Sequence, residues 1–310
     1  MTTPRFPFPL PDGWFQVAYA DDVAPGGLVK LRYFDRELVL FRGESGEAHV
    51  LDAFCPHLGA HLGVGGRVVG DRLRCPFHAW EFDGAGACVR VPYAKKIPPK
   101  AKLHAWPLVE RNGMIYIHFD KQGRAPTWEP PEVPEYASEA WTDYWRRDWI
   151  VETCAQEMAE NSVDPAHFKY VHRTAELPTA RAREQGHVFH VDMGYPIRMG
   201  EQLQQGTIDI DCYGFGIGVS RFRGIVDTTV VVSGTPLDAE RLHHRFSFLV
   251  RKLDSPEATR GLGNAFVSEI SRQFDEDRPI WETKVHWERP ALCDGDGPIG
   301  QLRRWGRQFY

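Results

Sequence analysis

The feature that most constrains this chain is a pair of similar clusters of metal-ligand residues. The first reads Cys55-Pro-His57, and after a further seventeen residues the second reads Cys75-Pro-Phe-His78. Two Cys and two His can hold zinc tetrahedrally, or a [2Fe–2S] cluster with both thiolates on one iron and both imidazoles on the other. Structural zinc usually takes like ligands from each loop. Because each loop here supplies one Cys and one His, the spacing favours the iron–sulfur cluster.

The residues around these motifs suit two facing ligand loops. We expect a strand before each loop, over 48–54 and 68–74, and the glycines between the loops permit tight turns. His61 lies outside both ligand pairs and is interpreted as a surface residue or one that supports a ligand. The alternative is that both cysteines are merely buried small residues and both histidines only form hydrogen bonds. Two neutral imidazoles raise the potential of a [2Fe–2S] cluster, so such a centre accepts electrons easily.

Length and composition bound the class of protein. With 310 residues, of which 42% are hydrophobic and 25% charged, the chain is long enough for two domains. A formal charge of −5 argues against a nucleic-acid-binding protein. Six cysteines without a dense disulfide pattern indicate a reducing compartment. Because no signal peptide and no long apolar run is visible, we expect a cytoplasmic protein without a membrane span.

The order of predicted elements indicates an α+β protein with two domains. Short strands separated by Asp, Gly and Pro turns continue to about residue 119 and predict a small antiparallel β domain. The segment 125–136 is rich in proline and indicates a linker. Beyond it, a helix over 152–163 precedes several strand-like runs that predict a second antiparallel sheet. We therefore predict domains over 1–125 and 126–310.

A second candidate metal site follows the predicted helix. Asp164-Pro165-Ala-His167 is followed by His172, and two histidines near a carboxylate suit Fe(II) with positions left open for dioxygen. The histidines are five residues apart, about 140° around a regular helix. Both can bind one ion only if the helix ends or is disturbed there, and Pro165 is expected to supply that disturbance.

The third ligand of this site is sought on a later helix. In the segment 263–282, apolar residues recur at near-helical spacing, and Asp277 lies in the middle of the apolar face they form. An ionised carboxylate there is costly unless it is paired or binds a metal. Asp277 is therefore preferred to Asp275. The alternative is that Pro279 ends the helix and leaves Asp277 as a solvated cap.

Electrons must come from another protein, because the sequence shows no flavin or nicotinamide site. The glycines of 214–218 lack the spacing and the following helix that a nucleotide loop needs. Arg67, Arg72 and Arg74 flank the second ligand loop and form either a docking rim for an acidic electron carrier or a solvated edge strand.

Taken together, these motifs resemble the oxygenase component of Rieske non-haem iron oxygenases. The resemblance rests on the Cys/His loops, on the run from Glu160 to His167 with His172, and on the segment 273–310. It implies a Rieske β domain followed by a helix-grip catalytic domain, assembled as a homotrimer. It also implies catalytic roles for Asn161 and Asp164, with Asp164 bridging His78 of one subunit to His167 of the next.

Within that family, the segments 91–96, 112–115 and 296–310 resemble cholesterol 7-desaturases and 3-ketosteroid 9α-hydroxylases. The resemblance implies hydroxylation or desaturation of a hydrophobic, steroid-like substrate, using O2 and electrons from a ferredoxin or ferredoxin reductase. Other possible functions are a monooxygenase acting on an aromatic or heterocyclic molecule, a pure electron carrier, and a zinc-stabilised lipid-binding module. Residues proposed to line an elongated apolar pocket are Ile208, Ile210, Phe246 and Phe248.

Overall fold

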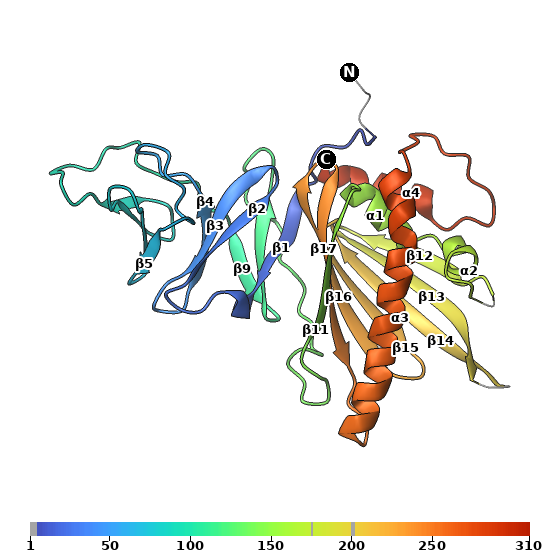
Figure 1. Ribbon diagram of the computed structural model, residues 1–310. Helices are drawn as coiled ribbons and strands as arrows, with labels where there is room; N and C mark the ends of the chain where they lie inside the picture. Colours follow the sequence, from blue (N-terminus) through green and yellow to red (C-terminus); the bar gives the residue numbers. More distant parts are fainter. Residues whose placement is uncertain (1–4, 175, 200–201) are drawn as a thin grey trace. The chain divides into compact units, whose positions relative to one another are not determined.

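The computed structural model describes residues 5–174, 176–199 and 202–310 of the chain (Figure 1). Residues 14–130 form one compact unit, here called the first unit, and residues 131–310 belong to the second unit. The described residues up to Gly13 also count with the second unit. There, the Asp12 backbone N–H donates to the Phe309 carbonyl at 2.7 Å. The domain boundary that we predict after residue 125 stays a prediction.

The first unit consists of short strands arranged in three small sheets, with orders β1-β10-β9, β2-β3-β4 and β5-β6-β7-β8. The strands are β1 (Gly13–Tyr19), β2 (Leu28–Tyr33), β3 (Arg36–Arg42), β4 (Ala48–Asp52), β5 (Arg67–Val69), β6 (Arg72–Arg74), β7 (Glu81–Phe82), β8 (Cys88–Arg90), β9 (Leu108–Arg111) and β10 (Met114–Phe119), with a 3₁₀ turn, η1 (Ala20–Asp22), after β1. The small antiparallel β domain expected from the sequence is confirmed.

One predicted strand of this unit is wrong. The segment 68–74 is not a single strand, because β5 and β6 are two antiparallel strands joined at Gly70 and Asp71. Gly70 has a φ of +61°, a left-handed conformation that glycine adopts at little steric cost and that favours a tight hairpin turn.

The second unit is built on a seven-stranded antiparallel sheet with the order β11-β17-β16-β15-β14-β13-β12. Its strands are β11 (Trp145–Val151), β12 (Thr179–Gln185), β13 (Val188–Met199), β14 (Gln202–Tyr213), β15 (Ile217–Arg223), β16 (Thr228–Asp238) and β17 (Arg241–Val250). Only β11 is paired out of sequence order, since it lies beside β17 at the edge of the sheet.

A long helix lies along this sheet, as Figure 1 shows for α3. The helices of the unit are α1 (Ala155–Asn161), α2 (Ala166–Tyr170), α3 (Pro256–Thr283) and α4 (Ile299–Gly306), with a terminal 3₁₀ turn, η2 (Arg307–Phe309). Ser255 caps the beginning of α3: its side chain accepts from the Ala258 backbone N–H, and Pro256 occupies the first helical turn. It continues through Pro279 to Thr283, so the proline does not end it. The predicted α+β class with a helix-grip catalytic domain is confirmed.

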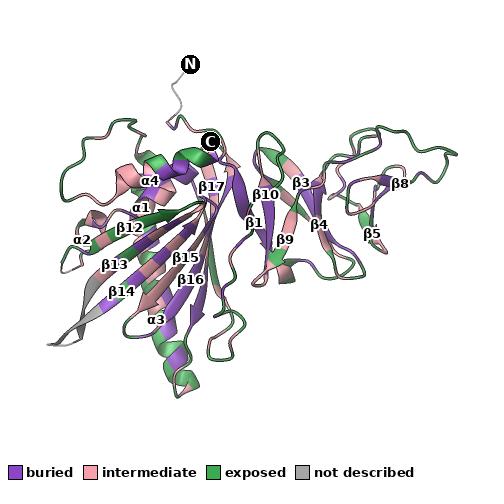
Figure 2. Ribbon diagram, turned by 180° about the vertical axis from the view of Figure 1, so that it is seen from behind, coloured by how far each residue is buried: buried purple, intermediate pink, exposed green. Residues whose placement is uncertain are grey.

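The core of the second unit has its larger part where the sheet meets α1, α4 and η2, and another part between α3 and the sheet. Figure 2 shows the central strands largely buried, and Val267 of α3 packs there against Val230 and Phe248. A Cβ built on Gly263 would lie 2.5 Å from the Trp145 ring, so the absence of a side chain permits the close approach of α3 to β11. In the described part of the chain, no helix is long and apolar enough to cross a membrane.

Candidate metal centres and active-site cavity

The two Cys/His loops of the first unit share one backbone arrangement. In the first loop, Cys55 accepts from the Gly59 N–H and donates to the Ala60 carbonyl. In the second loop, Cys75 makes the corresponding bonds to Ala79 and Trp80. Gly59 and Ala79 occupy matching positions and both have a left-handed φ, +76° and +56°. The repeated motif in the sequence thus folds into two copies of one turn.

The four predicted cluster ligands lie in like pairs. Cys55 and Cys75 are both buried and interact through their thiols, and the rings of His57 and His78 have centroids 4.6 Å apart. Among the described residues, the sets of three or more ligand atoms that lie within 4.8 Å of one another do not include these four side chains. Tetrahedral zinc would need ligand atoms about 3.8 Å apart. A two-iron cluster with one pair of ligands on each iron fits the spacing better.

The polar atoms of these loops also fit a bound cluster. The His78 Nδ1 atom is buried and has no hydrogen-bond partner within the described residues. Burial raises the pKa of the Cys55 thiol to about 11, and the neighbouring Cys75 adds to that rise. The Cys55 thiol would stay protonated by itself, whereas iron would hold a cysteine ligand as the thiolate.

Aromatic and charged side chains hold the second loop in place. The Trp80 ring stacks on His57 with centroids 4.5 Å apart and donates its N–H to the Tyr93 hydroxyl at 2.8 Å. Glu81 is 1% exposed and accepts from the guanidinium groups of Arg72, Arg74 and Arg90.

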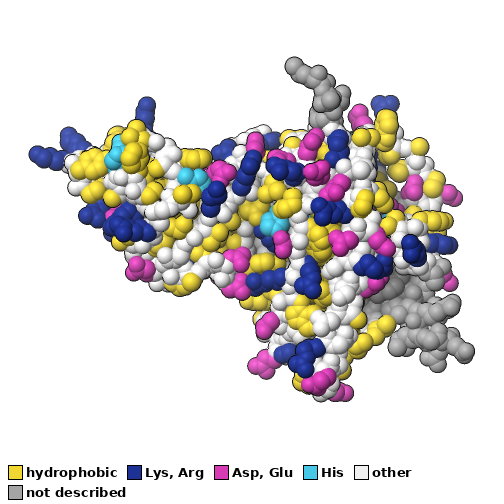
Figure 3. Space-filling model, in the orientation of Figure 1, with side chains coloured by type: hydrophobic (Ala, Val, Ile, Leu, Met, Phe, Trp, Pro, Cys, Tyr) yellow, Lys and Arg dark blue, Asp and Glu magenta, His cyan; other side chains and the backbone are white. Residues whose placement is uncertain are grey.

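Hydrophobic side chains surround these ligand loops at the surface. Figure 3 shows hydrophobic side chains gathered around histidine at one end of the first unit. The exposed residues there include Phe54, Leu58, Phe77 and Tyr93. His61, just after the first loop, is half-buried, with its Nε2 atom 3.5 Å from the Glu37 carboxylate.

In the second unit, the structure brings together the other predicted ligands. One ligand atom each from His167, His172 and Asp277 lies within 4.8 Å of the other two. Two neutral imidazoles and a carboxylate on one side of an ion form the donor set that suits Fe(II) with open positions. The His167 Nδ1 atom is buried and has no hydrogen-bond partner among the described residues. This is expected for an imidazole that binds a metal ion or a further polar group.

The end of a short helix explains how two histidines five residues apart can meet. His167 lies in α2, which ends at Tyr170, and His172 follows in the turn beyond it. Arg173 then has a φ of +61°, which redirects the chain. The expected disturbance is therefore present, but Pro165 does not cause it. Pro165 lies at the beginning of α2, where its fixed φ favours starting a helix.

His172 lies between two carboxylates of α3. Its Nε2 atom is 3.1 Å from Asp277 Oδ2, and its Nδ1 atom is 3.2 Å from Glu276 Oε2. Burial alone would lower the pKa of His172, but hydrogen bonds and charge from Asp277 and Glu276 raise it above its usual value. Asp277 is 5% exposed and so is no solvated cap. Asp275 instead accepts from the Trp149 indole N–H at 3.1 Å.

Glu276 is not among the residues predicted from the sequence. The periodicity that favours Asp277 gives no sign of the His172 ring, which reaches Glu276 from a distant segment of the chain. The contact orients the histidine: an Nδ1–H donated to Glu276 would leave the Nε2 lone pair free for a metal ion that Asp277 also binds.

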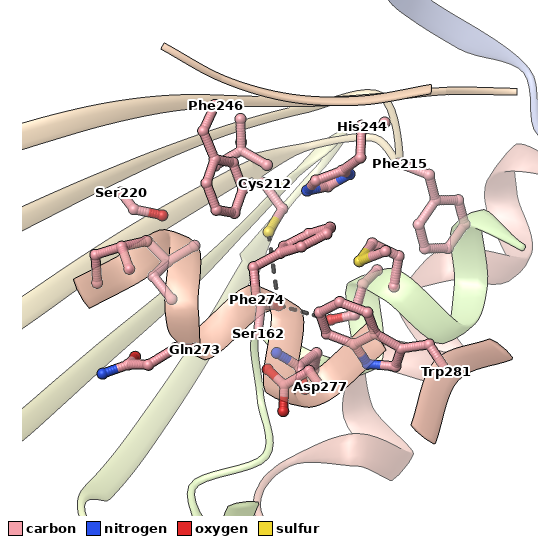
Figure 4. A pocket seen from close by; sticks show the side chains of 18 of the residues that line it. Ser162, Cys212, Phe215, Ser220, His244, Phe246, Gln273, Phe274, Asp277 and Trp281 are labelled. Carbon is pink, nitrogen blue, oxygen red and sulfur yellow. Dashed lines mark hydrogen bonds between the residues drawn. The ribbon is translucent and has the colours of Figure 1, made fainter. Parts of the chain in front are cut away.

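A mainly apolar cavity of about 1130 Å³, its open mouth included, adjoins this group of ligands. It lies between α3 and the sheet, and Figure 4 shows Asp277, Phe274 and Trp281 on one wall. Ile208, Ile210 and Phe246 line it as predicted. Phe248 does not, because it is fully buried in a cluster that includes Val230 and Val267.

The two residues with roles implied by the resemblance lie close to this cavity. Asn161, the last residue of α1, lines its wall. Asp164 Oδ2 lies 3.7 Å from His167 Nδ1, and Asp164 Oδ1 accepts from the Ala166 backbone N–H. Burial would raise the pKa of Asp164, but His167 and the backbone donors lower it, so its carboxylate stays ionised at neutral pH.

Two family models match the chain. Residues 13–107 match the Rieske [2Fe-2S] domain, and residues 117–310 match the 3-ketosteroid 9alpha-hydroxylase C-terminal domain. The chain therefore contains a Rieske [2Fe–2S] domain and a His/His/Asp candidate site for a mononuclear iron.

Solved structures show a similar fold. The structure of NdmB from Pseudomonas putida CBB5 covers 95% of this chain and 89% of its own, with a TM-score of 0.79 and 20% identity. A structure of dicamba monooxygenase bound to dicamba covers 96% of both chains, with a TM-score of 0.76 and 19% identity. At these identities the likeness concerns the fold alone.

Relatives in sequence are more similar. The 3-ketosteroid-9-alpha-monooxygenase, oxygenase component, of Rhodococcus rhodochrous is 33% identical over 320 residues, which cover 96% of this chain and 83% of the relative. Cholesterol 7-desaturase nvd 1 of Ciona intestinalis is 31% identical over 97% of this chain and 69% of its own length. This chain accordingly belongs to the Rieske non-haem iron oxygenases, as a relative of the 3-ketosteroid 9α-hydroxylase oxygenase components and the cholesterol 7-desaturases.

Proposed function

We propose that this Rieske oxygenase uses O2 and externally supplied electrons to hydroxylate or desaturate a hydrophobic, steroid-like polycyclic molecule. The observation that carries the proposal is the apolar cavity beside His167, His172 and Asp277. The match to the 3-ketosteroid 9alpha-hydroxylase C-terminal domain spans the whole segment that forms this cavity, which supports the substrate class.

The residues proposed to hold the metals follow from the two sites. Cys55, Cys75, His57 and His78 would bind the [2Fe–2S] cluster, and His167, His172 and Asp277 would bind Fe(II). When bound, the cluster supplies single electrons and the mononuclear iron binds and activates dioxygen.

The remaining tasks belong to the protein itself. The side chains of Phe222, Phe246 and Phe274 line the cavity and would exclude water from it. A polycyclic molecule would gain affinity there at roughly 25 cal/mol per Å² of apolar surface removed from water. Polar groups at a few positions would then decide which carbon faces the iron ligands.

Electrons are proposed to come from a ferredoxin or ferredoxin reductase. Such a carrier would approach the cluster loops. Arg72 and Arg74, part of the predicted docking rim, bind the buried Glu81, and this contact already explains why both are present. Arg67 is exposed and stays the better candidate for contact with an acidic carrier.

We further propose a homotrimer in which Asp164 links His78 of one subunit to His167 of the next. Co-expression of Cys75→Ser chains with His167→Ala chains tests this arrangement. Mixed oligomers would place an intact cluster beside an intact iron site, so activity should return although each variant alone is inactive. If the mixture stays inactive while forming mixed oligomers, electron transfer within one subunit is the better explanation.

Oxygen uptake coupled to product formation tests the reaction. The holoenzyme, supplied with a reductase system, is incubated with a sterol, a 3-ketosteroid or a small aromatic acid, and products are identified by mass. We expect coupled turnover with a steroid, and Asp277→Ala serves as the inactive control. Coupled turnover with the aromatic acid and with neither steroid would refute the proposed substrate class.

A further inference from the structure

One polar side chain in the cavity is not explained by the fold or by the metal group. His244, on β17, is 4% exposed, and its Nδ1 atom is buried without a hydrogen-bond partner in the described part of the chain. A buried polar atom without a partner costs stability, so such atoms are uncommon unless a ligand satisfies them. His244 does not belong to the group of ligand atoms formed by His167, His172 and Asp277.

The alternation of the strand directs His244 into the cavity. Its neighbour His243 points to the opposite face, where it bonds to Asp148 at 3.1 Å and accepts from Arg245 at 2.9 Å. The His244 ring stacks on Phe274, with centroids 5.2 Å apart and an interplanar angle of 21°. Figure 4 shows the ring extending into the cavity above Phe274.

A glycine lies next to this nitrogen on the neighbouring strand. Gly234 is the partner of His244 on β16, and a Cβ built on it would lie 3.3 Å from His244 Nδ1. A larger residue at that position would crowd the nitrogen. The glycine places no side chain against His244, and both residues line the cavity.

The chemistry of the cavity restricts what this imidazole can recognise. Burial lowers the pKa of His244 to about 3, with His243 and Arg245 adding to the effect, so the ring is neutral and offers one donor and one acceptor. The cavity lining, as far as the structure describes it, contains no Lys or Arg. A carboxylate bound at His244 would therefore lose its hydration without meeting a Lys or Arg side chain.

We propose that His244 hydrogen-bonds a neutral oxygen group, a ketone or a hydroxyl, of an otherwise apolar substrate and so fixes its orientation in the cavity. This inference rests on the proposed function and specifies its substrate class. An apolar body is held by Ile210, Phe222 and Phe246, and the single oxygen binds at His244. His244 thus selects which carbon lies nearest the three iron ligands.

A matched series of ligands tests the inference without relying on turnover. Equilibrium dialysis of the anaerobic holoenzyme is performed with 5α-androstan-3-one, 5α-androstan-3-ol, 5α-androstane and the corresponding 3-carboxylate. We expect the ketone or the alcohol to bind roughly tenfold more tightly than the hydrocarbon, as one net hydrogen bond predicts, and the carboxylate to bind most weakly.

Three variants assign the preference to His244. His244→Phe keeps an aromatic ring on Phe274 but removes both nitrogens, so it should lose the tenfold preference. His244→Gln should retain part of it, and His243→Gln, a change on the opposite face, should retain all of it. Melting temperature and cluster absorption report folding. If His244→Phe does not fold, the ligand series on the wild-type protein and on His244→Gln decides.

The possible results separate the inference from the function on which it rests. An unchanged preference in His244→Phe, no preference in the wild-type protein, or tightest binding of the carboxylate would overturn the role of His244. Oxygen uptake coupled to product is measured on the same ligands. A His244-dependent preference without any product would support the binding role and refute the proposed steroid reaction. Product formed without that preference would support the proposed steroid reaction and refute the binding role of His244.

Discussion

Glu276 offers a sharp test of the mononuclear site, because it contacts a proposed ligand without being one. Its carboxylate accepts from His172 Nδ1 at 3.2 Å and also binds Arg272. Replacing Glu276 by Ala would leave the His172 ring free to rotate and to take the other tautomer. Fewer imidazoles would then present the Nε2 lone pair to the metal.

The expected magnitude follows from this geometry. Loss of a residue that orients a metal ligand typically weakens metal affinity 10- to 100-fold, or about 1.4 to 2.7 kcal/mol. The Glu276 side chain is 28% exposed and shares its charge with Arg272, so water and the guanidinium screen it. We therefore expect the lower end, about tenfold weaker Fe(II) binding. Glu276→Gln should have a smaller effect, because its amide oxygen still accepts the hydrogen bond.

The assay is an Fe(II) titration of protein in which the cluster is intact and the mononuclear iron has been removed by a chelator. Glu269→Ala is the matched control, since Glu269 lies on the same helix and binds Arg272 through two hydrogen bonds. Its variant should bind Fe(II) within about twofold of the wild-type protein. Equal affinities for Glu276→Ala and wild type would show that Glu276 does not orient a metal ligand.

Three further predictions concern the remaining ligands and the first unit. Cys75→Ser should abolish the visible absorption of the cluster, whereas Cys293→Ser, at an exposed cysteine, should leave it unchanged; a retained spectrum in the first variant would contradict the assignment. Asp277→Ala should lose Fe(II) and turnover with the cluster still reducible, while Asp275→Ala loses only the bond from Trp149, about 1 kcal/mol of stability, and keeps its iron. Burial would raise the pKa of Glu81, but Arg74, Arg90 and Arg72 lower it, so Glu81 stabilises the fold above the ordinary carboxyl pKa of about 4.3 and loses this contribution as pH falls through its lower folded value. The difference in melting temperature between wild type and Glu81→Gln should therefore shrink from pH 7 to pH 3, and a constant difference would contradict the proposed pairing.

Sequence periodicity predicts residues whose environment is set by one element. The apolar stripe of α3 identifies Asp277 because every side chain on that face meets the same core. Alternation along β17 identifies Phe246 in the cavity wall for the same reason. It fails for Phe248, which shares that face, because Val267 of the distant α3 packs against it. Whether a residue on the inner face of a strand lines the cavity depends on the element that packs against that face. The sequence pattern of the strand alone does not contain this information.

Contacts between distant segments explain the other omissions. Glu276 gains its role from His172, 104 residues earlier in the chain, through a turn with a left-handed Arg173. In the sequence, His244 is simply one of two adjacent histidines. The structure distinguishes them, because His243 forms hydrogen bonds with Asp148 and Arg245. The role of a polar residue is easily overlooked in a sequence, because it depends on which partner the fold brings close to that residue.

The α3 helix joins the two tasks that the proposed reaction needs. Phe274 forms part of the cavity wall and stacks against the His244 ring. Asp277 follows less than one helical turn later. A shift of the helix that moved Phe274 would therefore move the carboxylate as well. Gly263 holds the helix close to Trp145 of β11, far along the sequence from both residues. The proposed substrate position and the ligand position both depend on where this helix lies, so we expect a larger residue at Gly263 to disturb both together.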